Sequence, residues 1–126
     1  MSLPRHPQVA RWLENLDETT RGEVDEALDY LQEHGRAAAL PDVGHRIQTS
    51  RHFPDMSEVR VNLGDGHIYR VLAGFGPNDL PALLLAGNKA GIGNRWYDQN
   101  VPIADDRFDA YLSALARSRP TTKEQS

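Results

Sequence analysis

The sequence predicts an α+β fold, in which N-terminal helices and a C-terminal helix pack on one small, mainly antiparallel, twisted β-sheet. Three observations lead to this prediction. Apolar residues recur at helical spacing near both ends of the chain, they alternate with polar residues in the middle, and turn sequences separate the alternating segments. The 126 residues suffice for one domain. We expect it over residues 1–116, with a frayed polar tail over 117–126.

Two helices are expected in the N-terminal third. Apolar side chains in residues 9–16, VARWLENL, fall at i, i+3, i+4 and i+7, which predicts a helix, with a short edge strand as the alternative at its start. The second helix is predicted over residues 18–34. Thr20 and Glu23 have the spacing of a capping box there, and Gly35 is suited to a left-handed cap.

Residues 36–44 can add one helical turn, after which the pattern changes from helical to alternating. The alternating segments predict strands at residues 57–63, 67–75 and 80–86, to which residues 45–50 can add another. The turn sequence Gly-Asp-Gly joins the first two as an antiparallel hairpin, and this pairing sets Arg60 directly opposite Arg70.

The C-terminal third begins with a glycine-rich loop, residues 87–94, which carries Lys89 but lacks the residue order of a P-loop. After Pro102, the segment ADDRFDAYLSALAR again has apolar residues at helical spacing. It predicts the last helix, with Asp105 or Asp106 as its cap.

The composition limits the cellular compartment and the kinds of active site that the chain can have. The chain has no cysteine, which excludes thiolate nucleophiles, cysteine zinc sites and disulfides, and fits a reducing cytosol. It has neither a recognisable signal sequence nor an apolar stretch of about 20 residues, so we expect no membrane span and a cytoplasmic location. The net charge is −4, but residues 45–97 carry a net +2. Any affinity for nucleic acid would therefore come from the middle of the chain.

Two classes of active site find little support. His45, His52 and His67 share no metal-ligand spacing, so we expect no metal site and no cofactor. Ser50 and His52 are adjacent in sequence, but no GxSxG elbow accompanies them, which argues against a Ser-His-Asp hydrolase.

The residue types do fit metal-free cleavage of RNA. In this reaction the ribose 2′-OH attacks the neighbouring phosphate while cationic donors stabilise the anionic transition state. Arg60, Arg70 and Lys89 are the candidate donors. Two facing arginines repel each other unless an anion lies between them, which suggests a phosphate. The alternatives are ion pairs with Glu58 or Asp65 and, for Lys89, an ordinary surface position.

Proton transfer and substrate contacts need further side chains. His52 and Tyr97 are the candidates for general acid and base. Arg51 and Trp96 are the candidates for binding substrate, through a phosphate and a stacked base. Packing in the core is the alternative for Trp96 and Tyr97.

The order of motifs resembles the RelE/ParE toxin superfamily, and within it the HigB-like, phage-associated branch. The resemblance rests on VARWLENL, ETTRGEVDEALDYLQEHG, SRHFPDMSEVR, YRVLAGF, LLLAGNKAG and WYDQNVPIADDRFDAYLSAL, in that order. Departures are the sequence EVR in place of ELR, and the tight turn GDG where many relatives have a polar connection and a second arginine.

This resemblance implies a toxin of a type II toxin-antitoxin system that cleaves translated mRNA on the ribosome without a metal ion. It further implies inhibition by a cognate antitoxin, often of helix-turn-helix type, and contact with DNA only through the antitoxin complex. By the same resemblance, Arg60, Arg70 and Lys89 would stabilise the phosphate or transition state, and His52 and Tyr97 would transfer protons. Two alternatives share the fold, a ParE-like inhibitor of DNA gyrase without enzymatic activity and an inactive toxin-like binding module.

Overall fold

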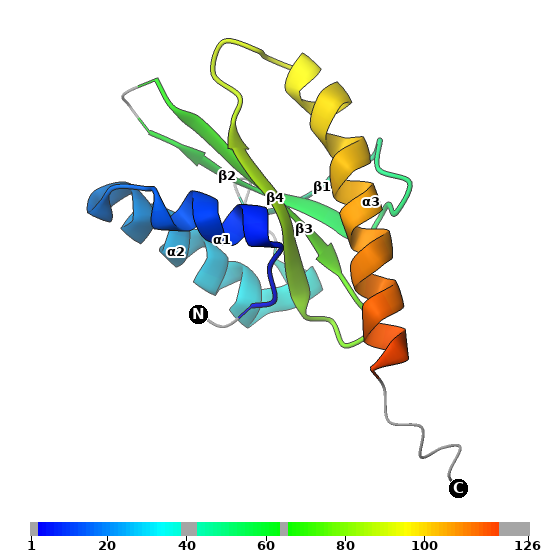
Figure 1. Cartoon of the computed structure of the whole chain (residues 1–126). Helices are drawn as coiled ribbons and strands as arrows, with labels where there is room; N and C mark the ends of the chain where they lie inside the picture. The colour runs from blue at the N-terminus through cyan, green and yellow to red at the C-terminus, as the bar shows by residue number, and fades with distance from the viewer. Residues whose placement is uncertain (1–2, 39–42, 64–65, 119–126) are drawn as a thin grey trace, which may run out of the picture.

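The structure is a computed structural model that describes residues 3–38, 43–63 and 66–118. Its elements follow in the order α1 (Pro7–Glu14), α2 (Glu18–His34), η1 (Gly35–Ala37), β1 (Val43–Arg46), β2 (Met56–Asn62), β3 (Ile68–Phe75), β4 (Pro81–Asn88) and α3 (Arg95–Arg117). The strands form one antiparallel sheet in the order β1-β2-β3-β4. Figure 1 shows this sheet with α1 and α2 on one side and α3 on the other. The predicted α+β fold is confirmed.

Because helices cover both faces of the sheet, its core has two halves. In one half, apolar residues of α1 and α2 pack on Val59 and Val71. In the other half, Phe108 and its neighbours on α3 pack on Leu72. Gly74 is required at this second contact, because a Cβ atom there would lie 2.7 Å from the Phe108 ring. Direct packing of this ring on β3 fixes α3 across the sheet.

The N-terminal helices agree with the sequence pattern except at the two caps of α2. Asp17 Oδ1 accepts a hydrogen bond from the Thr20 amide at 2.8 Å, so Asp17 caps α2 in place of the predicted Thr20–Glu23 box. Gly35 ends α2 with a positive φ of 54°, which glycine adopts readily, but its ψ of −138° lies outside the left-handed helical region predicted for this cap. The single turn η1 follows, and Pro41 lies outside the described residues.

The hairpin register is the one predicted, with Arg60 opposite Arg70. The further strand in front of it also exists, but it ends at Arg46, because the chain turns between Gln48 and Asp55 before entering β2. The edge strand considered at the N-terminus is a single parallel bridge between Arg5 and Leu83, and the helix α1 begins after it.

Helix α3 begins at Arg95, well before the predicted start after Pro102. Proline removes one backbone donor from a helix. Here the burial of Trp96 and Val101 against the sheet outweighs that loss. Asp105 is accordingly inside the helix rather than its cap, and its side chain accepts a hydrogen bond from Ser50 Oγ at 2.5 Å.

The predicted tail falls mostly on residues 119–126, which lie outside the described ranges. Within those ranges, no helix has an apolar stretch long enough to cross a bilayer.

Candidate functional site

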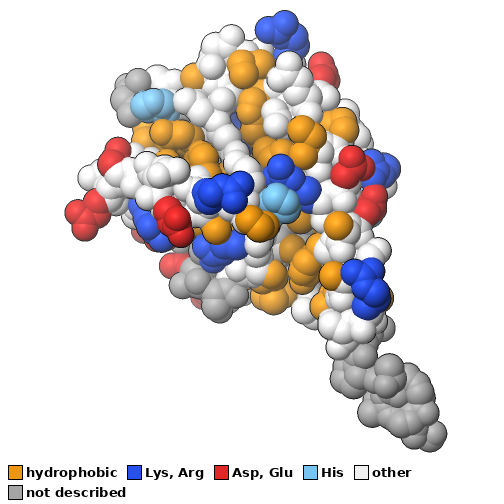
Figure 2. All heavy atoms as spheres, viewed as in Figure 1, with side chains coloured by type: hydrophobic (Ala, Val, Ile, Leu, Met, Phe, Trp, Pro, Cys, Tyr) orange, Lys and Arg blue, Asp and Glu red, His pale blue; other side chains and the backbone are white. Residues whose placement is uncertain are grey.

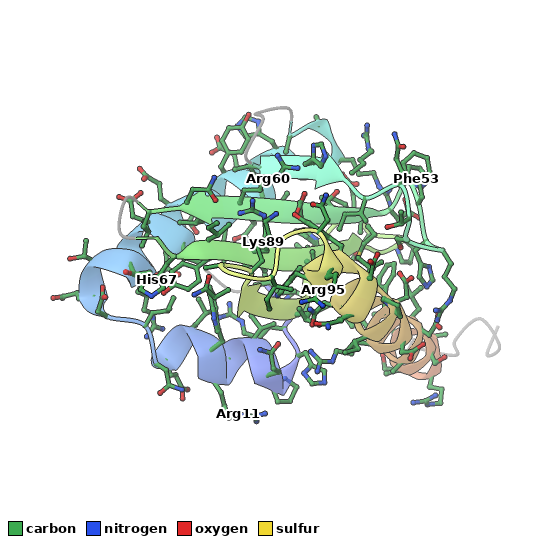
Figure 3. The ribbon with its side chains drawn as sticks, turned by 90° about the horizontal axis from the view of Figure 1, so that it is seen from above. Arg11, Phe53, Arg60, His67, Lys89 and Arg95 are labelled. Atoms are coloured by element: carbon green, nitrogen blue, oxygen red, sulfur yellow. The ribbon has the colours of Figure 1, made fainter. Side chains whose placement is uncertain are left out.

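A cleft opens on the α3 side of the sheet, where β1, the central strands and the start of α3 meet. Its volume is about 600 Å³, and its lining includes His45, Arg46, Glu58, Arg60, Arg70, Lys89, Tyr97 and Asp98. Figure 3 shows Arg60 and Lys89 close together above the strands, near the beginning of α3. Four of the side chains predicted from the sequence are therefore brought together: Arg60, Arg70, Lys89 and Tyr97.

The anion between the two facing arginines belongs to the protein itself. Glu58 Oε2 accepts hydrogen bonds from Arg60, at 3.0 Å from Nε and 2.9 Å from Nη2. Its other oxygen, Oε1, lies 3.6 Å from Arg70 Nε. Glu58 is only 2% exposed, although it stands on the strand face that the alternation marks as polar. The ion pair with Glu58, considered as an alternative for Arg60, is the arrangement observed.

The two arginines differ in how they are held. Arg70 is buried, and its guanidinium donates to Asn62 Oδ1 at 2.8 Å, to the Tyr69 carbonyl at 2.9 Å and to the Tyr97 hydroxyl at 3.1 Å. The side chain of Arg60 is 31% exposed. Arg60 therefore presents its charge to the cleft, whereas Arg70 holds the groups around it in position.

Tyr97 and Lys89 close the cleft beside this ion pair. The Tyr97 hydroxyl donates to Glu58 Oε1 at 2.8 Å. Burial raises the pKa of Tyr97, against the opposing effect of the hydrogen bond from Arg70, so the phenol remains protonated at neutral pH. Lys89 Nζ lies 5.1 Å from the centre of the Tyr97 ring. Burial, together with repulsion from Arg70 and Arg60, lowers the pKa of Lys89, while Glu58 opposes the shift.

His52 and Arg51 lie in another part of the molecule. His52 Nε2 donates to Asp109 Oδ1 at 2.7 Å, and Arg51 pairs with both Asp106 and Asp109. Asp109 is twelve residues beyond Tyr97 on α3, which corresponds to about 18 Å along the helix axis. The structure therefore does not bring His52 or Arg51 to the cleft.

Trp96 is also unavailable in the cleft. Its side chain is 4% exposed and belongs to the core beneath α3, with its ring edge-on to Tyr97 at 5.4 Å between centroids. Packing in the core, considered as the alternative to base stacking, describes its observed position.

Comparison with known proteins places this fold and cleft in a family. The sequence profile of the family described as "Phage derived protein Gp49-like (DUF891)" matches residues 11–109. The chain belongs to this family. It is 38% identical over 108 residues to a Mycobacterium tuberculosis protein named "Putative toxin HigB3", covering 86% of this chain and 90% of the relative.

A second relative from Mycobacterium tuberculosis, named "Putative toxin HigB2", is 32% identical over 118 residues. The matched region is 94% of this chain but 58% of that relative, so the chain spans little more than half of its length. No solved structure shows significant similarity to the chain. The resemblance to the phage-associated, HigB-like branch is confirmed, and the Gp49-like match includes every residue named above as lining the cleft.

Two residues of this Gp49-like cleft are not among the site residues predicted from the sequence. The sequence predicts Glu58 only as a pairing partner for an arginine. Its position two residues before Arg60, on the same strand face and on the strand that pairs with the Arg70 strand, is the signal for a place in the site. His45 is considered from the sequence only as a metal ligand. It is the register partner of Glu58 on β1 and is exposed at the cleft. The only signal for its position was the weak strand pattern around it.

Proposed function

We propose that the protein is the toxin of a type II toxin-antitoxin system and cleaves translated mRNA at the ribosome without a metal ion. The observation that carries the proposal is the cleft, which gathers cations, a carboxylate, a phenol and an imidazole on one sheet face. The names of the two relatives, both of which include the word toxin, support the same assignment. The proposal places the protein in the cytoplasm, with a cognate antitoxin as partner.

The reaction needs two proton transfers and charge stabilisation. A base removes the proton from the ribose 2′-OH as that oxygen forms a bond to the adjacent phosphorus. The bond from phosphorus to the 5′-oxygen breaks, and an acid gives this leaving oxygen a proton, so the products are a 2′,3′-cyclic phosphate and a 5′-OH. Cations placed around the phosphorane stabilise its developing negative charge.

Arg60 and Lys89 are the cations placed to contact this phosphate. Both line the cleft, and neither is fully buried. A phosphate entering between them would compete with Glu58 for Arg60. Arg70, fixed by its three acceptors, positions Tyr97, and the protonated phenol of Tyr97 in turn holds Glu58. We keep phosphate binding for Arg60 and Lys89. Arg70, predicted as a third donor to the phosphate, and Tyr97, predicted as a general acid or base, are here proposed to orient the site.

We assign one of the two proton transfers to His45 in place of His52. His45 stands beside Glu58 on the neighbouring strand, with an exposed side chain at the cleft, whereas His52 is bound to Asp109. An imidazole can accept or release a proton near neutral pH, and Glu58 is buried and engaged by Arg60 and Tyr97.

The experiment is induced expression in cells, followed by mapping of transcript 5′ ends and, in parallel, a gyrase supercoiling assay with purified protein. We expect new 5′ ends only within translated messages. Arg60→Ala and Arg70→Ala should each abolish growth inhibition, while the matched control Arg21→Ala on α2 stays toxic. Intact transcripts together with inhibited supercoiling would replace this proposal by the ParE-like alternative, and inactivity in both assays would leave the inactive binding module.

The role of His45 is tested by the rate of cleavage. His45→Ala should lower the rate at least tenfold, because the variant lacks a group that can transfer a proton. His34→Ala, an exposed histidine at the end of α2, is the control and should cleave like the wild type. A normal rate in His45→Ala would exclude His45 from the reaction.

A further inference from the structure

A second basic cluster lies outside the cleft, beside the outer edge of β4, and consists of His6, Arg11 and Arg107. His6 and Arg107 line the same groove, and Arg11 is an exposed residue of α1, which begins directly after His6. Burial, and then the charges of Arg107 and Arg11, lower the pKa of His6, and burial followed by Arg11 lowers that of Arg107. Figure 2, which faces β4 with α1 and α3 on either side, shows basic and histidine side chains gathered between the two helices.

This cluster differs from every other arginine group discussed above in having no acidic partner. Arg107 Nη1 donates to two neutral acceptors, the Leu84 carbonyl at 2.9 Å and Gln8 Oε1 at 3.2 Å. In the part of the chain that the structure describes, no ion pair joins His6, Arg11 or Arg107 to a carboxylate. Uncompensated positive charge at a surface attracts a negatively charged partner.

An apolar groove lies beside these cations. It has a volume of about 290 Å³ and is formed by the N-terminal segment, β4 and α3, with Pro4, Ala82, Leu83, Leu84, Ala110 and Tyr111 in its lining and Arg107 at its side. We call it the β4-edge groove. Its size suits a large apolar side chain rather than a whole domain.

The backbone of β4 is already occupied along this groove. The Leu83 amide donates to the Pro4 carbonyl and the His6 amide donates to the Leu83 carbonyl, both at 2.8 Å. The side-chain amide of Gln8 bonds both the amide and the carbonyl of Ala86. A partner therefore cannot add a strand at these positions and must bind through side chains.

From this geometry we infer that the β4-edge groove docks an acidic, amphipathic segment of the antitoxin. One apolar side chain of that segment fills the groove, and its carboxylates meet Arg11, Arg107 and His6. The inference rests on the proposed function for the existence of the antitoxin. Arg107 is ten residues beyond Tyr97, or about 15 Å along α3, so this contact is separate from the cleft.

The test uses the purified antitoxin, taken as the product of the adjacent reading frame that suppresses growth inhibition. Its binding to the full toxin is measured by calorimetry at two salt concentrations. Arg11→Glu and Arg107→Gln should each weaken binding at least tenfold and reduce its salt dependence, and Arg21→Glu on α2 is the charge-matched control. Ala110→Trp, at an exposed position in the groove, should weaken binding by filling the space without altering a charge.

Thermal melts establish that each variant is folded, and the exposed sites Arg11 and Ala110 keep the test decisive if Arg107→Gln unfolds. Wild-type affinity in Arg11→Glu and Ala110→Trp would overturn the inference. So would self-association of the toxin that Arg11→Glu abolishes, because a second copy would then occupy the groove. Arg11→Glu should cleave mRNA like the wild type, because Arg11 is outside the cleft. If the wild-type protein binds the antitoxin but does not cleave mRNA, the proposed function is refuted and the docking inference is not.

Discussion

The cleft and the cluster around Arg51 contain the same kinds of side chain in two different settings. In the cleft, Glu58 is 2% exposed, and Arg60, Arg70 and Tyr97 surround it. In the Arg51 cluster, which consists of Arg51, His52, Asp106 and Asp109, the side chains of Arg51 and Asp109 are 51% and 50% exposed. Water screens the charges of the Arg51 cluster, whereas in the cleft Glu58 and Arg70 are buried and Arg60 is partly exposed.

This difference indicates where electrostatic energy is concentrated. Removing one partner of a buried, hydrogen-bonded ion pair leaves the other charge buried and uncompensated. Removing one partner of an exposed ion pair costs less, because water already solvates the charge that remains. The cleft should therefore respond strongly to conservative changes, and the Arg51 cluster should respond weakly to the same changes.

The largest effect is expected from Glu58→Gln. This nearly isosteric change removes the negative charge between Arg60 and Arg70, and should lower the free energy of unfolding by about 3–5 kcal/mol. Urea denaturation measures the loss, and Glu26→Gln, an exposed position on α2, is the matched control. Equal midpoints for the two variants would show that the cleft is no more sensitive than the surface.

A smaller effect is expected from replacing arginine by lysine in each region. Arg70 donates to three acceptors around its planar guanidinium, which a lysine cannot satisfy together, so Arg70→Lys should destabilise by about 1.5–3 kcal/mol. Arg51→Lys should leave the unfolding midpoint unchanged, since Arg51 is exposed. The same denaturation assay checks both, and a reversed order would contradict the comparison.

The hydroxyl of Tyr97 offers a more local change. Tyr97→Phe keeps the ring and removes the donor to Glu58 and the acceptor for Arg70, with an expected loss of about 1–3 kcal/mol. Because burial raises the pKa of Tyr97 in the fold, a titration followed by ultraviolet absorbance should show a late-ionising tyrosine in the wild type that is absent from Tyr97→Phe. Tyr30→Phe on α2 is the control for stability, and an equal loss of stability there would contradict the assignment.

The sequence pattern was sufficient for α2 and for the hairpin register, because caps, turns and alternation are local signals. It failed at the start of α3, where the burial of Trp96 overrides Pro102. It also failed to predict the buried position of Glu58, because alternation marks which face a residue occupies but does not reveal that α3 covers that face. His52 is predicted as a site residue from the chemistry of its imidazole and from the family resemblance, but its side chain pairs with Asp109 on α3, away from Arg60.

The smallest effect is expected in the Arg51 cluster, and it depends on pH. Hydrogen bonds from Arg51 and then from His52 hold the pKa of Asp109 below its ordinary value. A carboxyl whose pKa is depressed by folding adds stability above its unfolded pKa, about 3.9, and this contribution disappears as the pH falls through the folded pKa.

Asp109→Asn should therefore lower the melting temperature slightly at pH 7 and reduce the loss of stability between pH 4 and pH 2. Melting curves at pH 7, 4 and 2 test this, with Asp29→Asn, an exposed position on α2, as the control. Parallel curves for wild type and Asp109→Asn would mean that the exposed pairs contribute nothing measurable, which would widen the contrast with the cleft.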